Sequence, residues 1–442
     1  MHRPHDDPSS AVGSAASLIG STLTVTQAMR RALALALRGP AGGANPQVGA
    51  VILSPSSHAP SLPPSLAPSP TPTHPEFCHG TGTKSADSVA KPKGSPRGAD
   101  AEPVGGSRGA GVGLEYRVLG EGWHRGAGTA HAEVAALAAA AEAGHDVRGA
   151  TAVVSLQPCN ATGRTGPCTR ALIDAGIAEV VFAATDPLAE AAGSTATLES
   201  AGVRVHPGLL AEEGVDLLHP WLTSVRLGRP YVTLKLATTL DGRVAARDGT
   251  SRWITGPQAR AHAHAVRQTV GAILVGTGTV AADDPWLTAR TPEGGLAERQ
   301  PLRVVVGERA VPDGARLRGP GGALVQIRTH DMGRVLAELG ERGVRHVLVE
   351  GGPTLSTAFL AAGVVDEVHA YLAPVALGAG LGAIGDLGVR TMADAPRWRT
   401  HHVGRLGDDV LLVARRAPED ALRQHEPPPH EPQHDQQQHG ED

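Results

Sequence analysis

Hydrophobic positions along the chain alternate between short apolar runs and longer stretches in which apolar residues recur every three or four positions. In the first half, the short runs predict strands at 48–53, 115–124, 151–156 and 179–184. The longer stretches predict helices at 26–39, 129–144 and 168–176. Strands that alternate with helices are typical of a three-layer α/β sandwich.

The second half repeats this alternation after a less patterned stretch at 208–228. Its apolar runs predict strands at 231–237, 271–276, 301–307, 323–327, 346–352 and 367–374, with helices between them. We therefore expect an α/β chain of two domains, at 23–207 and 229–416, joined by a linker at 208–228.

Three segments lack either pattern, namely 1–22, 54–114 and 417–442. The middle one is rich in Pro, Ser and Gly and includes Cys78, and the last is rich in Pro, Gln and His. Such compositions cannot bury enough apolar surface to build a core. We expect disorder in all three, with 54–114 as an insertion between adjacent strands.

The composition narrows the function classes. A net charge of −4 and an aromatic content of 2% disfavour a basic groove or stacking platform for nucleic acid. No apolar run approaches the ~20 residues that span a bilayer, and the N-terminus carries Asp6 and Asp7 where a signal peptide needs basic residues. We expect a cytoplasmic protein without membrane or nucleic-acid partners.

Two of the three cysteines in the chain, Cys159 and Cys168, lie close together in the stretch SLQPCNATGRTGPC. Upstream, the tripeptide HAE places His131 and Glu133 at the start of a predicted helix. A catalytic zinc ion takes three protein ligands and leaves one position open, and a nearby carboxylate can carry protons. We expect His131, Cys159 and Cys168 to bind zinc and Glu133 to be catalytic. The alternatives are ordinary buried thiols with a capping histidine, or a closed structural zinc site.

The stretches NPQVGAV (45–51), GEGWHRGAGTAHAEVAAL (120–137) and LQPCNATGRTGPCTRALIDAGIAEVV (156–181) resemble the deaminase half of the bifunctional riboflavin-biosynthesis deaminase-reductase family. The resemblance implies a cytidine-deaminase-like fold with one Zn²⁺ per chain. It also implies hydrolysis of the ring 2-amino group of 2,5-diamino-6-ribosylamino-4(3H)-pyrimidinone 5′-phosphate. By resemblance, Asn45 contacts the pyrimidine and Arg164 the phosphoribosyl portion.

Three positions depart from the pattern of that family. Gln157 replaces a usual glutamate, Ala161 replaces a usual histidine, and Leu188 interrupts a usual DPNP motif. These departures concern the substrate side of the deaminase rather than the zinc ligands.

A second candidate site centres on Lys235, the only lysine outside the 54–114 insertion. It lies on a predicted strand that ends in an Asp-Gly turn, and Glu350 at the end of another strand is its candidate partner; a solvent-facing lysine is the alternative. The motif VEGGPT (349–354) predicts an anion cradle of free backbone N–H groups at a helix start. AILVGTGTV (272–280) only loosely resembles a dinucleotide fingerprint.

These stretches resemble the reductase half of the same family, whose fold is similar to dihydrofolate reductase. The resemblance implies NADPH-dependent reduction of the ribosyl to a ribityl side chain. It implies an NADPH site at Ala237, Trp253, Thr279, Asp283, Gly352, Pro353, Thr354, Leu355, Ser356, Thr357 and Ala358. It implies a substrate site at Ser251, Arg267, Leu287, Arg290 and Glu350, with the arginines on the phosphate. Lys235 is expected to be catalytic and the protein to be a homo-oligomer.

Other functions remain open at this point. One is a zinc deaminase of nucleosides or nucleic acid fused to an unrelated domain. Another is a reductase that has weakened or lost its deaminase, or a zinc-binding scaffold without catalysis.

Overall fold

The computed structural model describes residues 16–55, 114–161, 166–188 and 191–416. Most of the three segments predicted to be disordered, including Cys78, lie outside the described residues, as does Arg164. Residues 16–22 are an exception, since the Leu18 N–H donates to Glu121, and Ile19 packs against the core. The prediction of disorder was wrong for these residues.

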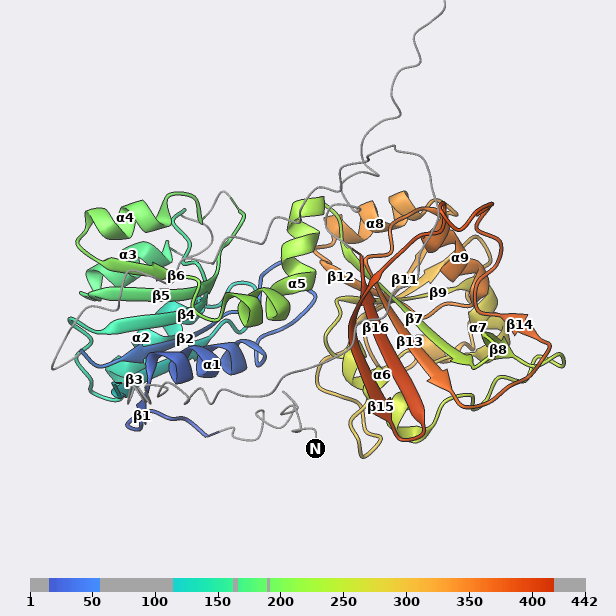
Figure 1. The fold of residues 1–442 in the computed structure, drawn as a ribbon, viewed down its shortest axis with the longest axis horizontal. Coiled ribbons are helices and arrows are strands. Elements are labelled where there is room, and N and C mark those ends of the chain that lie inside the picture. Colours follow the sequence, from blue (N-terminus) through green and yellow to red (C-terminus); the bar gives the residue numbers. More distant parts are fainter. Residues whose placement is uncertain (1–15, 56–113, 162–165, 189–190, 417–442) are drawn as a thin grey trace, which may run out of the picture.

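The first domain is a three-layer sandwich around a six-stranded sheet (Figure 1). Its strands are β1 (Thr22–Leu23), β2 (Gly49–Leu53), β3 (Tyr116–Trp123), β4 (Thr151–Leu156), β5 (Glu179–Ala184) and β6 (Arg204–Pro207). They lie in the order β1-β3-β2-β4-β5-β6, with β4, β5 and β6 parallel and the other pairs antiparallel. Every residue of β2 and β4 is buried, as expected for strands covered on both faces.

Helices cover both faces of this sheet. One face packs against α2 (Ala132–Glu142), α3 (Cys168–Asp174) and α4 (Ser194–Ser200). The other packs against α1 (Val25–Ala36), whose first turn is closed by a reciprocal capping box between Thr24 and Gln27. The predicted α/β sandwich is confirmed, although α1 begins at Val25 rather than at Thr26.

The stretch expected as a linker contains a helix, α5 (Ala211–Leu227). Its residues Leu218, Trp221 and Leu222 are buried in one cluster with Leu156 and Ala184 at the ends of β4 and β5. Gly214 and Pro220 interrupt the apolar periodicity, which explains why the sequence did not indicate a helix. The helix thus belongs to the packed structure and contacts β7 and β12 of the second domain as well.

The second domain is built on an eight-stranded mixed sheet in the order β11-β10-β9-β12-β7-β13-β16-β15. Its strands are β7 (Tyr231–Thr239), β9 (Ala272–Gly276), β10 (Leu302–Val306), β11 (Leu324–Ile327), β12 (His346–Val349), β13 (Glu367–Ala373), β15 (Arg399–Leu406) and β16 (Asp409–Arg415). The first six in sheet order are parallel, and β16 and β15 add an antiparallel hairpin that the sequence analysis did not identify. A small pair, β8 (Arg243–Ala245) and β14 (Leu381–Gly382), lies beside it.

Helices again lie on both faces of this sheet. Those of the domain are α6 (Pro257–Arg267), α7 (Thr277–Asp283), α8 (Met332–Glu341) and α9 (Pro353–Ala361). Residues of α8 and α9 pack with one face of the sheet, and Val280 of α7 packs with the other. The carboxyl ends of β7, β9 and β12 meet at one edge, where ligands bind in open parallel sheets. Among the described helices, none has the length and apolarity to cross a membrane.

Candidate active sites

The first candidate site is a cluster of one imidazole and two thiols at the ends of three elements. His131 directly precedes α2 without a capping hydrogen bond from its side chain, Cys159 follows β4, and Cys168 is the first residue of α3. Their possible ligand atoms all lie within 4.8 Å of one another. His131 Nδ1 is 3.2 Å from Cys168 Sγ and 3.5 Å from Cys159 Sγ, and the Cys168 N–H donates to Cys159 Sγ at 3.3 Å. The structure therefore brings the three predicted zinc ligands together.

The electrostatics of the cluster fit a metal site. The hydrogen bond from Cys168, with that from His131, lowers the pKa of Cys159 to about 4, whereas the pKa of Cys168 is raised by the same contact and by burial. The hydrogen bond to Cys159 raises the pKa of His131. The cluster thus favours a thiolate, and a nitrogen with two sulfurs is a donor set that zinc accepts while keeping a fourth position open.

Glu133 lies in the first turn of α2, beside the cluster, and is only 3% exposed. Burial raises the pKa of its carboxyl, with Cys159 adding to the shift and His131 opposing it. A buried carboxyl with a raised pKa next to a metal site is suited to take up and return a proton.

Asn45 is linked to the zinc cluster through His124, a residue that had no predicted role. The side-chain nitrogen of Asn45 lies 2.8 Å from His124 Nε2, and His124 is only 4% exposed. The ring of His124 stands edge-on to that of His131, with centroids 5.5 Å apart. His124 occurs in the GWH motif directly after β3, and its place at a strand end near HAE was the signal available in the sequence.

Gln157 and Leu188, which depart from the pattern of the family, both contact other parts of the deaminase domain or α5. The Gln157 amide donates to Ser194 at 2.8 Å and accepts from the Asp186 N–H at 3.3 Å, so it links the end of β4 to the start of α4 and to the loop after β5. Leu188 packs against the cluster that includes Trp221 of α5. Ala161 is exposed.

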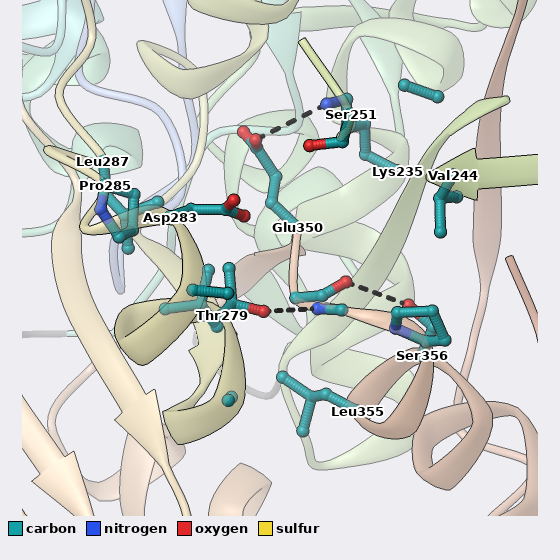
Figure 2. A pocket seen from close by; sticks show the side chains of 18 of the residues that line it. Lys235, Val244, Ser251, Thr279, Asp283, Pro285, Leu287, Glu350, Leu355 and Ser356 are labelled. Carbon is teal, nitrogen blue, oxygen red and sulfur yellow. Dashed lines mark hydrogen bonds and ion pairs between the residues drawn. The ribbon is translucent and has the colours of Figure 1, made fainter. Parts of the chain in front are cut away.

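The second candidate site is a cavity of about 1060 Å³ at the carboxyl edge of the second sheet. Figure 2 shows Lys235, Asp283 and Glu350 among the side chains that line it. The cavity contacts all the expected substrate residues of this domain, namely Ser251, Arg267, Leu287, Arg290 and Glu350. It also contacts the expected cofactor residues Ala237, Trp253, Thr279, Asp283, Gly352, Pro353, Thr354, Leu355, Ser356 and Ala358. Thr357 does not line it, because its hydroxyl donates to the Pro353 carbonyl and accepts from the Gly385 N–H.

A charged group of three residues lies within this cavity. Glu350 receives two hydrogen bonds from Arg267, one on each carboxylate oxygen, at 2.7 and 2.8 Å, and Lys235 Nζ lies 3.7 Å from Oε2, one of those two oxygens. Burial alone would raise the pKa of Glu350, but Arg267 and Lys235 hold it at about 2. The predicted pairing of Lys235 with Glu350 is confirmed, and Glu350 is ionised at neutral pH.

Arg267 is less available to a phosphate than expected. Besides its two bonds to Glu350, it donates to the Thr288 carbonyl at 2.8 Å. Arg290 makes a single described bond, to the Gly294 carbonyl at 2.9 Å. Arg290 is therefore the better placed of the two arginines to meet a phosphate, while Arg267 holds Glu350.

At the start of α9, where an anion cradle of free N–H groups was predicted, three of the backbone N–H groups already have acceptors. The Gly352 N–H donates to Thr279 Oγ1 at 2.8 Å, and the N–H groups of Leu355 and Ser356 bond back to the Gly352 carbonyl. These three N–H groups are thus not free: those of Leu355 and Ser356 are satisfied within the first turn of α9, and that of Gly352 is satisfied by Thr279 of α7. The hydrogen bond that Thr279 accepts from Gly352 links α7 to the start of α9 in the lining of the cavity (Figure 2).

Comparisons with known proteins agree with both sites. Residues 230–412 match the family model of the RibD C-terminal domain, and residues 96–184 match that of the cytidine and deoxycytidylate deaminase zinc-binding region. The chain is 47% identical over 297 residues to the riboflavin biosynthesis protein RibD of Mycobacterium tuberculosis, covering 67% of this chain and 86% of that protein. It is 38% identical over 331 residues to RibD of Escherichia coli, covering 67% and 89%.

Solved structures show the same similarity over both domains. A diaminohydroxyphosphoribosylaminopyrimidine deaminase/5-amino-6-(5-phosphoribosylamino)uracil reductase from Thermotoga maritima matches with a TM-score of 0.69 at 28% identity, covering 89% of this chain and 99% of that one. RibD from Acinetobacter baumannii matches with a TM-score of 0.67 at 30% identity, covering 88% and 98%.

Proposed function

This chain belongs to the RibD family of riboflavin biosynthesis proteins, and we propose that its two sites catalyse two successive steps on one phosphorylated pyrimidine. It is a bifunctional enzyme with a deaminase and a reductase domain. The proposed first step is hydrolysis of the ring amino group of 2,5-diamino-6-ribosylamino-4(3H)-pyrimidinone 5′-phosphate. The proposed second step is reduction of its ribosyl group to ribityl with NADPH.

In the deaminase site, His131, Cys159 and Cys168 would hold one zinc ion. Bound zinc supplies the acidity that makes water a nucleophile at neutral pH. Glu133 takes a proton and returns it to the departing amino group, a role that its raised pKa suits. Asn45, held by His124, orients the pyrimidine ring.

In the reductase site, the residues mainly position two molecules. NADPH supplies the hydride. Thr279, Gly352 and the start of α9 would hold the cofactor, and Arg290 would hold the substrate phosphate. Lys235 and Glu350 face the same cavity, where the lysine can donate a hydrogen bond to the ribose oxygen.

The observation that carries the proposal is the cluster of His131, Cys159 and Cys168 beside buried Glu133, on the same chain as a cavity that contacts Lys235 and Glu350. The purified protein should convert the diaminopyrimidinone phosphate to a deaminated product without NADPH. With NADPH added, it should produce a reduced product two mass units heavier than the deaminated one. A protein that yields neither product contradicts the proposal.

A nucleic-acid deaminase is the competing function. The net charge of −4 supports a small-molecule substrate instead. Binding of single-stranded DNA or RNA in a gel-shift assay, with deamination of the bound strand, would favour the competitor.

The cellular setting is also proposed. Cys159 and Cys168 must stay reduced to bind zinc, which supports a reducing compartment such as the cytoplasm. Strand β15 ends the second sheet and exposes Val403, which supports pairing of this edge in a homo-oligomer. Cell fractionation tests the cytoplasmic location, and sedimentation of the purified protein tests the homo-oligomer.

A further inference from the structure

The segment Arg38–Ala44, which joins α1 to Asn45 in the deaminase domain, is held by groups outside that domain. Arg299 of the reductase domain donates to the carbonyl of Gly39 at 2.6 Å and also to the carbonyl of Arg38. The Arg345 N–H donates to the Gly42 carbonyl at 2.9 Å. Trp221 of α5 donates to the Ala44 carbonyl at 3.0 Å. The segment that leads to Asn45 is therefore fixed along its length.

The two backbones also touch directly in this region. A Cβ atom placed on Gly42 would lie 2.1 Å from the nitrogen of Gly271, and one placed on Gly271 would lie 2.3 Å from the Gly42 carbonyl oxygen. Gly42 further has a positive φ of 72°, which glycine adopts without strain. The contact therefore requires glycine on both sides and leaves little freedom for the segment to shift.

The same segment contacts the pyrimidine side of the deaminase site. A Cβ atom on Gly39 would lie 2.6 Å from the His124 carbonyl oxygen, so the two backbones are in close contact. The Arg38 guanidinium lies 3.8 Å from the ring centroid of Trp123, the residue before His124. Because His124 in turn holds Asn45 at 2.8 Å, a shift of Gly39 would displace the pair that faces the substrate.

Arg299 itself is placed by the reductase fold. Its neighbour Gln300 accepts from the Ala289 N–H at 2.9 Å and donates to the Ala289 carbonyl at 2.8 Å. Ala289 lies between Thr288 and Arg290, which both line the reductase cavity. Through its neighbour Gln300, Arg299 is thus fixed to the wall of the reductase cavity, while its guanidinium holds the segment Arg38–Ala44 of the deaminase domain.

We propose that Arg299 is a positioning residue for deamination, through which the reductase domain fixes the segment Arg38–Ala44 and so places Asn45 and His124 for the pyrimidine. This inference rests on the proposed deaminase function. Arg299 does not touch the zinc cluster, so its loss should act on substrate binding rather than on the chemical step.

The test compares Arg299→Ala with Arg318→Ala in the full chain. Arg318 is a matched control, since it also donates to two carbonyls, those of Val311 and Pro312, but within the reductase domain. Arg299→Ala should raise the deaminase KM about tenfold, as expected for the loss of hydrogen bonds that hold a binding group. The deaminase kcat, the zinc content and the reductase kinetics should change little, and Arg318→Ala should leave all of these unchanged.

Two further measurements separate positioning from general damage. Arg299→Lys should recover part of the KM, because lysine can still donate to one carbonyl. Hydrogen exchange over residues 36–50 should be faster in Arg299→Ala and unchanged in Arg318→Ala. An unchanged KM and exchange rate in Arg299→Ala, or an equal loss of both activities, would overturn the inference. A wild-type protein without deamination would instead overturn the proposed function.

Discussion

The two sites differ in how the fold assembles them. The zinc cluster is compact, with its donor atoms within 4.8 Å, and its residues come from the ends of neighbouring elements of one sandwich. The reductase site is a cavity of about 1060 Å³ whose residues span Lys235 to Ala383. The first is built for one ion and one proton carrier, whereas the second must hold two whole molecules side by side.

Their electrostatics differ in the same way. In the first site, burial raises the pKa of Glu133 and leaves its carboxyl able to exchange a proton. In the second, Arg267 and Lys235 hold the pKa of Glu350 at about 2, so that this carboxylate stays charged. Two buried glutamates thus suit opposite purposes: Glu133 has the role of proton carrier in the proposed deamination, and Glu350 holds charged neighbours.

The largest effect expected from a single substitution is on proton transfer. Glu133→Gln keeps the shape of the side chain but removes the group that carries the proton. We expect deamination to fall by about 10²-fold or more, with the zinc content unchanged because Glu133 is not a ligand. Product analysis by mass, with metal analysis in parallel, measures both.

The same variant tests whether the sites are separate. Reduction of substrate that has already been deaminated should proceed at the wild-type rate, because Lys235 and Glu350 lie in the other domain. Equal losses of both activities would mean that the two sites do not act independently.

The second prediction concerns the charged group in the reductase cavity. Glu350→Gln leaves Arg267 and Lys235 without their anion, and removing one partner of a buried ion pair costs about 3–5 kcal/mol. The free energy of unfolding of the reductase domain should fall by about that amount near neutral pH. Denaturation followed at a probe within this domain measures it.

The contribution of Glu350 to the free energy of unfolding should depend on pH. The pKa of Glu350 is lowered from 4.5 to about 2 by folding, so its stabilisation is complete above about pH 4.5 and is lost as the pH falls towards 2. The stability difference between wild type and Glu350→Gln should therefore shrink over that interval. A difference that stays constant from neutral pH to pH 2 would show that the carboxylate charge is not its source.

The sequence predicted the zinc site better than the cavity. Cys159 and Cys168 are two of only three cysteines in the chain, His131 and Glu133 lie in one short motif at a helix start, and zinc chemistry restricts how such ligands are arranged. The sequence did not reveal that the Gly352 N–H, which was expected to be free in an anion cradle, donates to Thr279, which lies far away in the chain. His124 was missed for a related reason, since its role depends on the packing of Asn45 against it.

The elements of the fold were also predicted best where the local sequence alone determines them. Strands buried on both faces, such as β2 and β4, are visible as continuous apolar runs. Helix α5 was hidden by Gly214 and Pro220, although Gly214 is needed where the helix approaches Ala183, since a Cβ there would lie 2.8 Å from the alanine side chain. Residues that serve a close tertiary contact obscured the local pattern.

A smaller effect is expected at Ala161, a position where the family resemblance implies a histidine. Asn160 cannot readily supply the missing donor, because its side chain is bonded to Thr169 and to the Ala192 carbonyl. Ala161→His should therefore raise the deaminase kcat/KM, by up to about tenfold for one recovered hydrogen bond. Reductase kinetics serve as the internal control, and a histidine variant no better than wild type would mean that the loop works with alanine.

The smallest effect is expected from removing residues 56–112, which lie outside the described residues. The strands on either side are already paired, since the Ser54 N–H donates to the Arg117 carbonyl at 2.8 Å and Leu53 lies opposite Val118. A short Gly-containing turn can therefore close the hairpin, and the entropy of closing a loop depends only weakly on its length. The melting temperature, the zinc content and both activities should stay close to wild type. Loss of zinc with the fold intact would instead identify the deleted segment, and Cys78 within it, as part of the metal site.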